Sequence, residues 1–383
     1  MKITTYIKKD TLYFVLITLS FLSLLRALIV PIFADEITYK NLADSIMEGR
    51  YYLNNQPSTV TPVIPFIMSL FYSALAPTVG IILMKCFNIL MMCFGFRYVY
   101  LFLKSQGVDI RIVTAILVLT LTNTTSIAWF SRIYPEAILF FSFWGFLYYY
   151  TKEISISNFR KMLFFFALLT LTRYLYILLG VFVLIYYYKC FYKKALNRRD
   201  NIHIILSSLV IAIPLLIWFK YVYFIEQNQT SGISYFHRFK EDNIFIYNIK
   251  CGLGLLQHHE VNKINGIPAF ISLFVPITGL RNFLISIVLI VLFLLGYIKA
   301  KKSYGIVILF SNILIIMVGF ILAGTGFSRY WLLLLPGFYL GYYYIYKTFK
   351  LKDEWFIRIT KCISIVYVLN ELRLDYMVIT AHL

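Results

Sequence analysis

Long apolar runs separated by short basic segments constrain the fold of this chain more than any other feature of its sequence. A helix that spans a membrane needs about 20 mostly apolar residues. The run Leu12–Ile32 meets this length, and Arg26 is its only charged residue. Across all 383 residues, 61% are hydrophobic and 14% are charged, whereas soluble domains carry about a quarter charged residues. The sequence therefore excludes a water-soluble enzyme and predicts an all-α polytopic membrane protein.

The apolar runs predict about 10–11 transmembrane helices in a single transmembrane domain over residues 1–383, with no soluble domain. Later candidate spans are Gly80–Leu103, Ile112–Phe130, Tyr134–Thr151, Ile202–Val222, Gly279–Tyr297, Gly305–Ala323 and Tyr330–Tyr346. A weaker last span begins near Trp355.

Basic clusters between the runs fix the orientation, because Lys and Arg accumulate in cytoplasmic loops. Whether the number of crossings is odd or even, its parity, decides on which side each loop lies. The basic clusters all fall in the cytoplasm only if two of the apolar segments do not count as single crossings. Thr61–Ala76 is short and is expected to be an interfacial or re-entrant helix. Met162–Tyr188 lies between two basic clusters and is expected to be a broken hairpin, with its break near Thr172 and Arg173.

The same parity places three segments on the non-cytoplasmic side: residues 33–78 with juxtamembrane amphipathic helices, the turn 131–136, and a long loop over residues 223–278. The formal net charge of +19 follows from the basic cytoplasmic loops. Membrane lipids are therefore expected partners, and nucleic acid is not.

Two adjacent carboxylates, Asp35 and Glu36, stand where the first span ends, in a chain with only 17 acidic residues. They precede an amphipathic helix expected over Ile37–Glu48 and closed by Gly49. A carboxylate at this water boundary suits a general base. Asp is equally a preferred helix N-cap, so the pattern leaves both roles of Asp35 open.

A second acidic position lies in the turn 131–136. Pro135 suits the first turn of a helix, and Glu136 would interact well with the helix N-terminus. Arg132 has a simple alternative role, since it can extend to the lipid headgroups. Neither structural role accounts for an Arg and a Glu that flank a tyrosine on the face that carries Asp35.

Three further cations are placed at depth in the apolar chain, namely Lys85, Arg173 and Arg329. Charges at such positions are costly and usually face a cavity or a partner. Guanidinium groups match phosphate oxygens well. A phosphate group and an ion pair with a neighbouring helix are both compatible with these residues.

The long loop over residues 223–278 contains His237, His258 and His259. Adjacent histidines point about 100° apart on a helix, and the HExxH spacing of zinc hydrolases is absent. We therefore expect a polar loop that faces substrate, and no metal site there.

Taken in order, these motifs resemble the GT-C superfamily of membrane glycosyltransferases, and most closely its bacterial branch related to protein O-mannosyltransferases and lipid A aminoarabinose transferases. The motifs are Ala34-Asp35-Glu36, Pro62 and Pro65, Gly80 with Lys85, the turn Arg132 to Pro135-Glu136, Thr172-Arg173, and Arg329-Tyr330 followed by Pro336. The likeness covers Leu12–Phe191 well and the C-terminal third loosely.

The resemblance implies an inverting transfer of a sugar from a polyprenyl-phosphate donor to a lipid-linked, glycan or protein acceptor, on the outer side of a bacterial cytoplasmic membrane. It implies that Asp35 is the general base, with Glu36 and Glu136 as further catalytic acids. Donor phosphate binding would fall to Lys85, Arg132, Arg173 and Arg329. A divalent cation, Mg²⁺ or Mn²⁺, is used by some relatives, and the sequence leaves its use open.

Two other classes of protein remain open. A transporter or flippase for a lipid-linked sugar or anion would use the same cations but would not need a carboxylate at the end of the first span, and it would often show repeat symmetry. A glycan polymerase would fit the long loop over residues 223–278 but not the helix that begins near Asp35.

Overall fold

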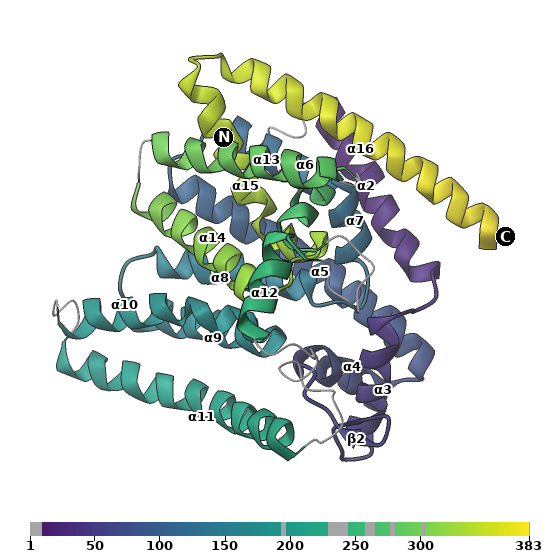
Figure 1. Cartoon of the computed structure of the whole chain (residues 1–383), viewed down its shortest axis with the longest axis vertical. Coiled ribbons are helices and arrows are strands. Elements are labelled where there is room, and N and C mark those ends of the chain that lie inside the picture. The colour runs from purple at the N-terminus through teal and green to yellow at the C-terminus, as the bar shows by residue number, and fades with distance from the viewer. Residues whose placement is uncertain are drawn as a thin grey trace.

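The computed structural model describes residues 10–192, 197–228, 244–256, 265–275, 280–300 and 303–382, and these residues are almost entirely helical (Figure 1). The first helices are α2 (Thr11–Ile29), α3 (Asp35–Met47), α4 (Val63–Ala74), α5 (Pro77–Ser105), α6 (Ile110–Thr122), α7 (Thr124–Phe130) and α8 (Glu136–Tyr150). The next are α9 (Ile156–Thr172), the 3₁₀ helix η1 (Tyr174–Leu179), α10 (Gly180–Phe191), α11 (Arg198–Asn228), α12 (Ile244–Leu253) and η2 (Ile267–Leu273). The last are α13 (Leu280–Lys299), α14 (Tyr304–Leu322), η3 (Ser328–Leu334), α15 (Leu335–Thr348) and α16 (Asp353–His382). One small antiparallel hairpin pairs β1 (Tyr52–Leu53) with β2 (Gln56–Pro57).

Six helices of the described chain are long and apolar enough to cross a membrane: α2, α5, η1 with α10, α11, α13 and α14. A seventh span results if α6 and α7 count as one, although they meet at an angle of 64°. The all-α membrane architecture is therefore confirmed, whereas the expected count of 10–11 spans is wrong within the described residues.

The lost spans have clear physical causes. The run Tyr134–Thr151 forms only the 15-residue helix α8, which is shorter than a membrane-spanning helix. The run Tyr330–Tyr346 is divided between η3 and the 14-residue α15. The last candidate, α16, begins with Asp353 and Glu354 and carries further charges along its length.

Two segments were predicted not to form a single membrane-spanning helix, and neither does so. Arg173 is extended, with φ −152° and ψ 126°, and it separates α9 from η1, so the expected break near Thr172 and Arg173 is present. The segment Thr61–Ala76 contains only the 12-residue α4. The expected loop 223–278 is more ordered than predicted, because α11 extends to Asn228 and both α12 and η2 lie within the loop.

The centre of the bundle is α8, which packs between α5 and α9. Nearly all of its side chains are buried, including Phe140, Phe143 and Trp144. The indole of Trp144 donates a hydrogen bond to the carbonyl of Leu333, at 3.0 Å, which joins α8 to η3. This central position of α8 fixes its first residue, Glu136, inside the protein.

The outer helices are less enclosed. In Figure 1, α11 lies at the edge of the bundle beside α9 and α10, while α16 runs along α2. The ammonium of Lys361 contacts the carboxylate of Asp10 at 2.5 Å, which ties α16 to the start of α2. A second link between these helices involves Arg26 and is described below.

A close helix crossing provides a test of the packing. A Cβ atom on Gly296 of α13 would lie 2.0 Å from the carbonyl oxygen of Gly341 in α15. We expect Gly296→Ala to cost about 1–3 kcal/mol of stability, because overpacked helices must separate, and to lower the unfolding temperature in detergent. Gly180→Ala is the matched control, since its Cβ would meet only the ring of Phe166 at 3.4 Å. Equal unfolding temperatures for both variants would contradict this packing.

Candidate active site

Four of the residues that the sequence singles out meet at one place in the fold: Asp35, Glu136, Arg173 and Arg329. They come from four separate elements, namely the start of α3, the start of α8, the break between α9 and η1, and the second residue of η3. We call these four residues the charged cluster. Local structure places each of them at a helix boundary, where the chain changes direction.

The cluster is a chain of alternating charges. Arg329 Nη2 donates to Asp35 Oδ2 at 2.9 Å, and Arg329 Nε lies 3.7 Å from Glu136 Oε1. Arg173 Nη2 donates to the same Glu136 oxygen at 2.7 Å. Glu136 therefore holds two guanidinium groups with one oxygen atom, and Arg329 links it to Asp35.

The two carboxylates of the cluster, Asp35 and Glu136, differ in their exposure to solvent. The side chain of Asp35 is 51% exposed, whereas that of Glu136 is 2% exposed. Asp35 Oδ1 accepts no hydrogen bond from the described residues, while Glu136 Oε2 is buried there without a hydrogen-bond partner. Asp35 can thus exchange a proton with a bound molecule or with water, but Glu136 is enclosed by protein.

Aromatic rings enclose the two arginines. The guanidinium of Arg329 lies 4.6 Å from the ring centre of Tyr134 and 4.9 Å from that of Trp129, and Arg173 lies 3.6 Å from that of Tyr330. Burial opposes ionisation of Tyr330, but the positive charges of Arg173 and Arg329 outweigh it, so the pKa of this phenol is below its ordinary value. The rings restrict both guanidinium groups to one orientation.

The structure tests one of the two roles left open for Asp35, that of a helix cap. Helix α3 begins at Asp35 itself, its N-cap is Ala34 with φ 50°, and no side chain caps it. The capping interpretation is therefore wrong, and the Asp35 carboxylate is directed to Arg329 instead. A positive φ at a residue with a Cβ is strained, and here it accompanies the turn that presents Asp35.

Glu36 has a different environment from its neighbour. It is 1% exposed, and both of its oxygens accept backbone hydrogen bonds, from Ile133 N at 2.8 Å and from Phe33 N at 3.2 Å. These bonds join the end of the first span to the turn 131–136. Glu36 thereby fixes the position of Asp35 relative to Glu136.

Lys85 and Arg132 lie beside the cluster rather than in it. Lys85 Nζ donates to the carbonyls of Ala27 and Val30, both at 2.7 Å, and so satisfies the last turn of α2. The guanidinium of Arg132 lies 4.5 Å from the ring centre of Phe33. Within the described residues, Arg132 forms no ion pair, which leaves its charge available.

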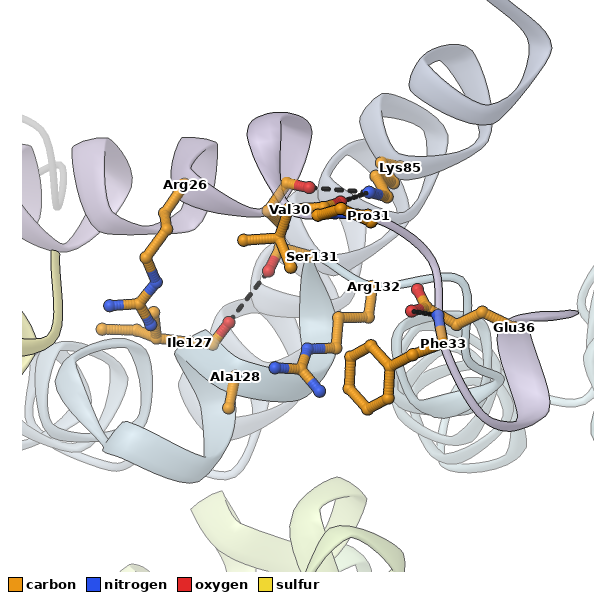
Figure 2. Close-up of a pocket in the computed structure, with 11 residues that line it drawn as sticks. Arg26, Val30, Pro31, Phe33, Glu36, Lys85, Ile127, Ala128, Ser131 and Arg132 are labelled. Atoms are coloured by element: carbon orange, nitrogen blue, oxygen red, sulfur yellow. Dashed lines mark hydrogen bonds between the residues drawn. The ribbon is translucent and has the colours of Figure 1, made fainter. Parts of the chain in front are cut away.

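An open pocket lies beside the charged cluster (Figure 2), and none of the four cluster residues lines it. Its charged lining residues are Arg26, Glu36, Lys85 and Arg132, which are three cations and one carboxylate. The sequence interpretation did not include Arg26 in the site. The signal for it was a single charge inside an otherwise apolar span.

The three histidines expected to face substrate, His237, His258 and His259, lie outside the described residues. Within the described ranges, no group of three or more His, Cys, Asp or Glu side chains could hold a metal ion. The cluster itself does not suit a divalent cation, because both of its carboxylates already contact guanidinium groups.

No protein-family model, curated protein or solved structure matches the chain. The resemblance to GT-C glycosyltransferases thus stays a prediction from the order of the motifs.

The different burial of the two carboxylates predicts different costs of removing them. Glu136→Ala should cost about 3–5 kcal/mol, because it leaves two mostly enclosed guanidinium charges without their shared partner. Asp35→Ala should cost about 0–1 kcal/mol, as is typical of exposed ion pairs. Thermal unfolding of the purified variants in detergent would measure both, and a loss of similar size for the two variants would argue against this cluster.

Proposed function

We propose that this protein is a membrane glycosyltransferase that moves a sugar from a polyprenyl-phosphate donor to a hydroxyl acceptor, with inversion at the anomeric carbon. One observation carries the proposal: Asp35 is a half-exposed carboxylate held by Arg329 beside a pocket lined by cations, and its Oδ1 accepts no hydrogen bond from the described residues. Capping does not explain Asp35, since it caps no helix. A fixed carboxylate beside an anion pocket suits group transfer from a phosphate.

In the proposed reaction, the acceptor hydroxyl oxygen attacks the anomeric carbon while Asp35 takes the hydroxyl proton. The new bond joins that oxygen to the sugar. The bond between the anomeric carbon and the phosphate oxygen breaks, and its electron pair stays on the departing polyprenyl phosphate. The transition state has oxocarbenium character, and Arg329 keeps Asp35 in one orientation throughout.

The departing phosphate needs a cation that is not already neutralised. Arg132 meets this requirement, because it stacks on Phe33 and has no carboxylate partner in the described chain. Phe33 is two residues from Asp35 in the segment between α2 and α3. A phosphate bound at Arg132 would therefore lie close to the base. Fixed donors in a water-poor pocket stabilise developing negative charge without reorganisation.

The other predicted phosphate ligands take supporting roles in this proposal. Lys85 closes the end of α2, Arg173 holds Glu136, and Arg329 orients the base. Glu36 and Glu136 position Asp35 rather than touch the substrate. We place the site on the non-cytoplasmic side, where the basic loops put the end of the first span.

Replacement of the base tests the proposal directly. Asp35→Asn should lower the transfer rate by about 10²–10⁴-fold, the usual contribution of general base catalysis, while expression and unfolding temperature stay close to those of the wild type. Mass spectrometry of lipid-linked glycans from cells that contain the wild type, the variant or no protein would identify the missing sugar and its acceptor.

Asp44→Asn is the matched control, because Asp44 lies on the same helix α3 and pairs with Lys40 at 2.7 Å. It should leave the glycans unchanged. If Asp35→Asn also leaves them unchanged, the assignment of Asp35 as base is wrong. Unchanged glycans in cells without the protein, together with altered uptake or export, would instead favour a transporter.

A further inference from the structure

Arg26 is the one pocket cation that is held by the C-terminal helix. Its Nη1 donates to Asp375 Oδ1 at 2.7 Å and its Nη2 donates to Glu371 Oε2 at 2.8 Å. Asp375 also accepts a hydrogen bond from Ser23 on α2, at 2.5 Å. Two carboxylates of α16 therefore fix a single guanidinium near the end of α2.

Glu371 is the more buried of these two carboxylates, and burial of its charge costs free energy. The Glu371 side chain is 0% exposed. Burying a carboxylate costs free energy that an ion pair repays only with good geometry. An apolar residue at this position would link α16 to α2 at lower cost, so the pair serves the position of Arg26.

Arg26 and Arg132 line the same pocket. Figure 2 shows their guanidinium groups on either side of Ala128. Burial lowers the pKa of Arg132, the carboxylate of Glu36 raises it, and the charge of Arg26 lowers it, so the two guanidinium groups repel each other. An anion between them would relieve this repulsion. A guanidinium has five N–H donors, and the two bonds to α16 leave others for such an anion.

We propose that Glu371 and Asp375 are positioning residues, which hold Arg26 so that it binds the phosphate of the donor together with Arg132. This inference rests on the proposed function for the identity of the phosphate. It makes α16 part of the donor site rather than a peripheral helix, and it assigns a role to an arginine that the motifs do not include.

The test measures binding of farnesyl phosphate, a short prenyl phosphate, to the purified full chain in detergent by calorimetry. Arg26→Gln and Glu371→Gln should each weaken binding by about tenfold, the size expected for one charge-assisted hydrogen bond. The double variant should bind no more weakly than Arg26→Gln alone, because Glu371 acts through Arg26. Arg26→Lys keeps a positive charge beside Glu371 but lacks the planar set of N–H donors of a guanidinium group. This variant should also bind farnesyl phosphate weakly, while its unfolding temperature stays at the wild-type value.

Lys361→Gln is the matched control, since it removes the other ion pair between α2 and α16, at Asp10. It should leave binding unchanged. The inference is overturned if Lys361→Gln weakens binding as much as Glu371→Gln, if the effects of Arg26 and Glu371 add, or if wild-type protein does not bind farnesyl phosphate. A failure of the proposed function looks different, because Asp35→Asn would then retain transfer whatever the binding results show.

Discussion

The contact of Glu136 with Arg173 and Arg329 is the interaction on which the candidate site depends. Glu136 Oε1 accepts a hydrogen bond from Arg173 Nη2 at 2.7 Å and lies 3.7 Å from Arg329 Nε. It thereby joins α8, the break after α9 and the start of η3, which are far apart in the sequence. A buried charge is costly without its partner, so the position in which Arg329 holds Asp35 depends on the packing of all three elements.

Around this contact, the cations differ in what satisfies them. Arg173 and Arg329 contact carboxylates, Lys85 contacts two carbonyls, and Arg26 contacts two acids of α16. Arg132 differs from the other four, because it forms no ion pair within the described residues and lies against the rings of Phe33 and Trp129. The carboxylate of Glu36 acts on it only through its charge. Four of the five cations thus already have polar partners, whereas Arg132 has no ion-pair partner within the described residues. For this reason we place the proposed phosphate beside Arg132 rather than at the more deeply placed arginines.

Much of the architecture could be predicted from single positions. Basic clusters on both sides of Met162–Tyr188 required a break, and the break is at Arg173. Pro62 before α4, Pro65 in its first turn and the short apolar run indicated a short helix. The number of spans could not be predicted, because hydropathy does not show that Tyr330–Tyr346 divides into η3 and α15. Whether Asp35 caps its helix could not be predicted either, since a cap and a base have the same sequence pattern.

The sequence by itself determined that the chain is a helical membrane protein, because apolar length and charge distribution act locally and additively. It also determined which residues are costly to bury. Tertiary structure alone decided how those residues are paired. Arg329 lies 294 residues from Asp35, and Glu371 lies 345 residues from Arg26. Such pairs form only when helices pack, since the energy of an ion pair depends on distance and burial and not on position in the chain.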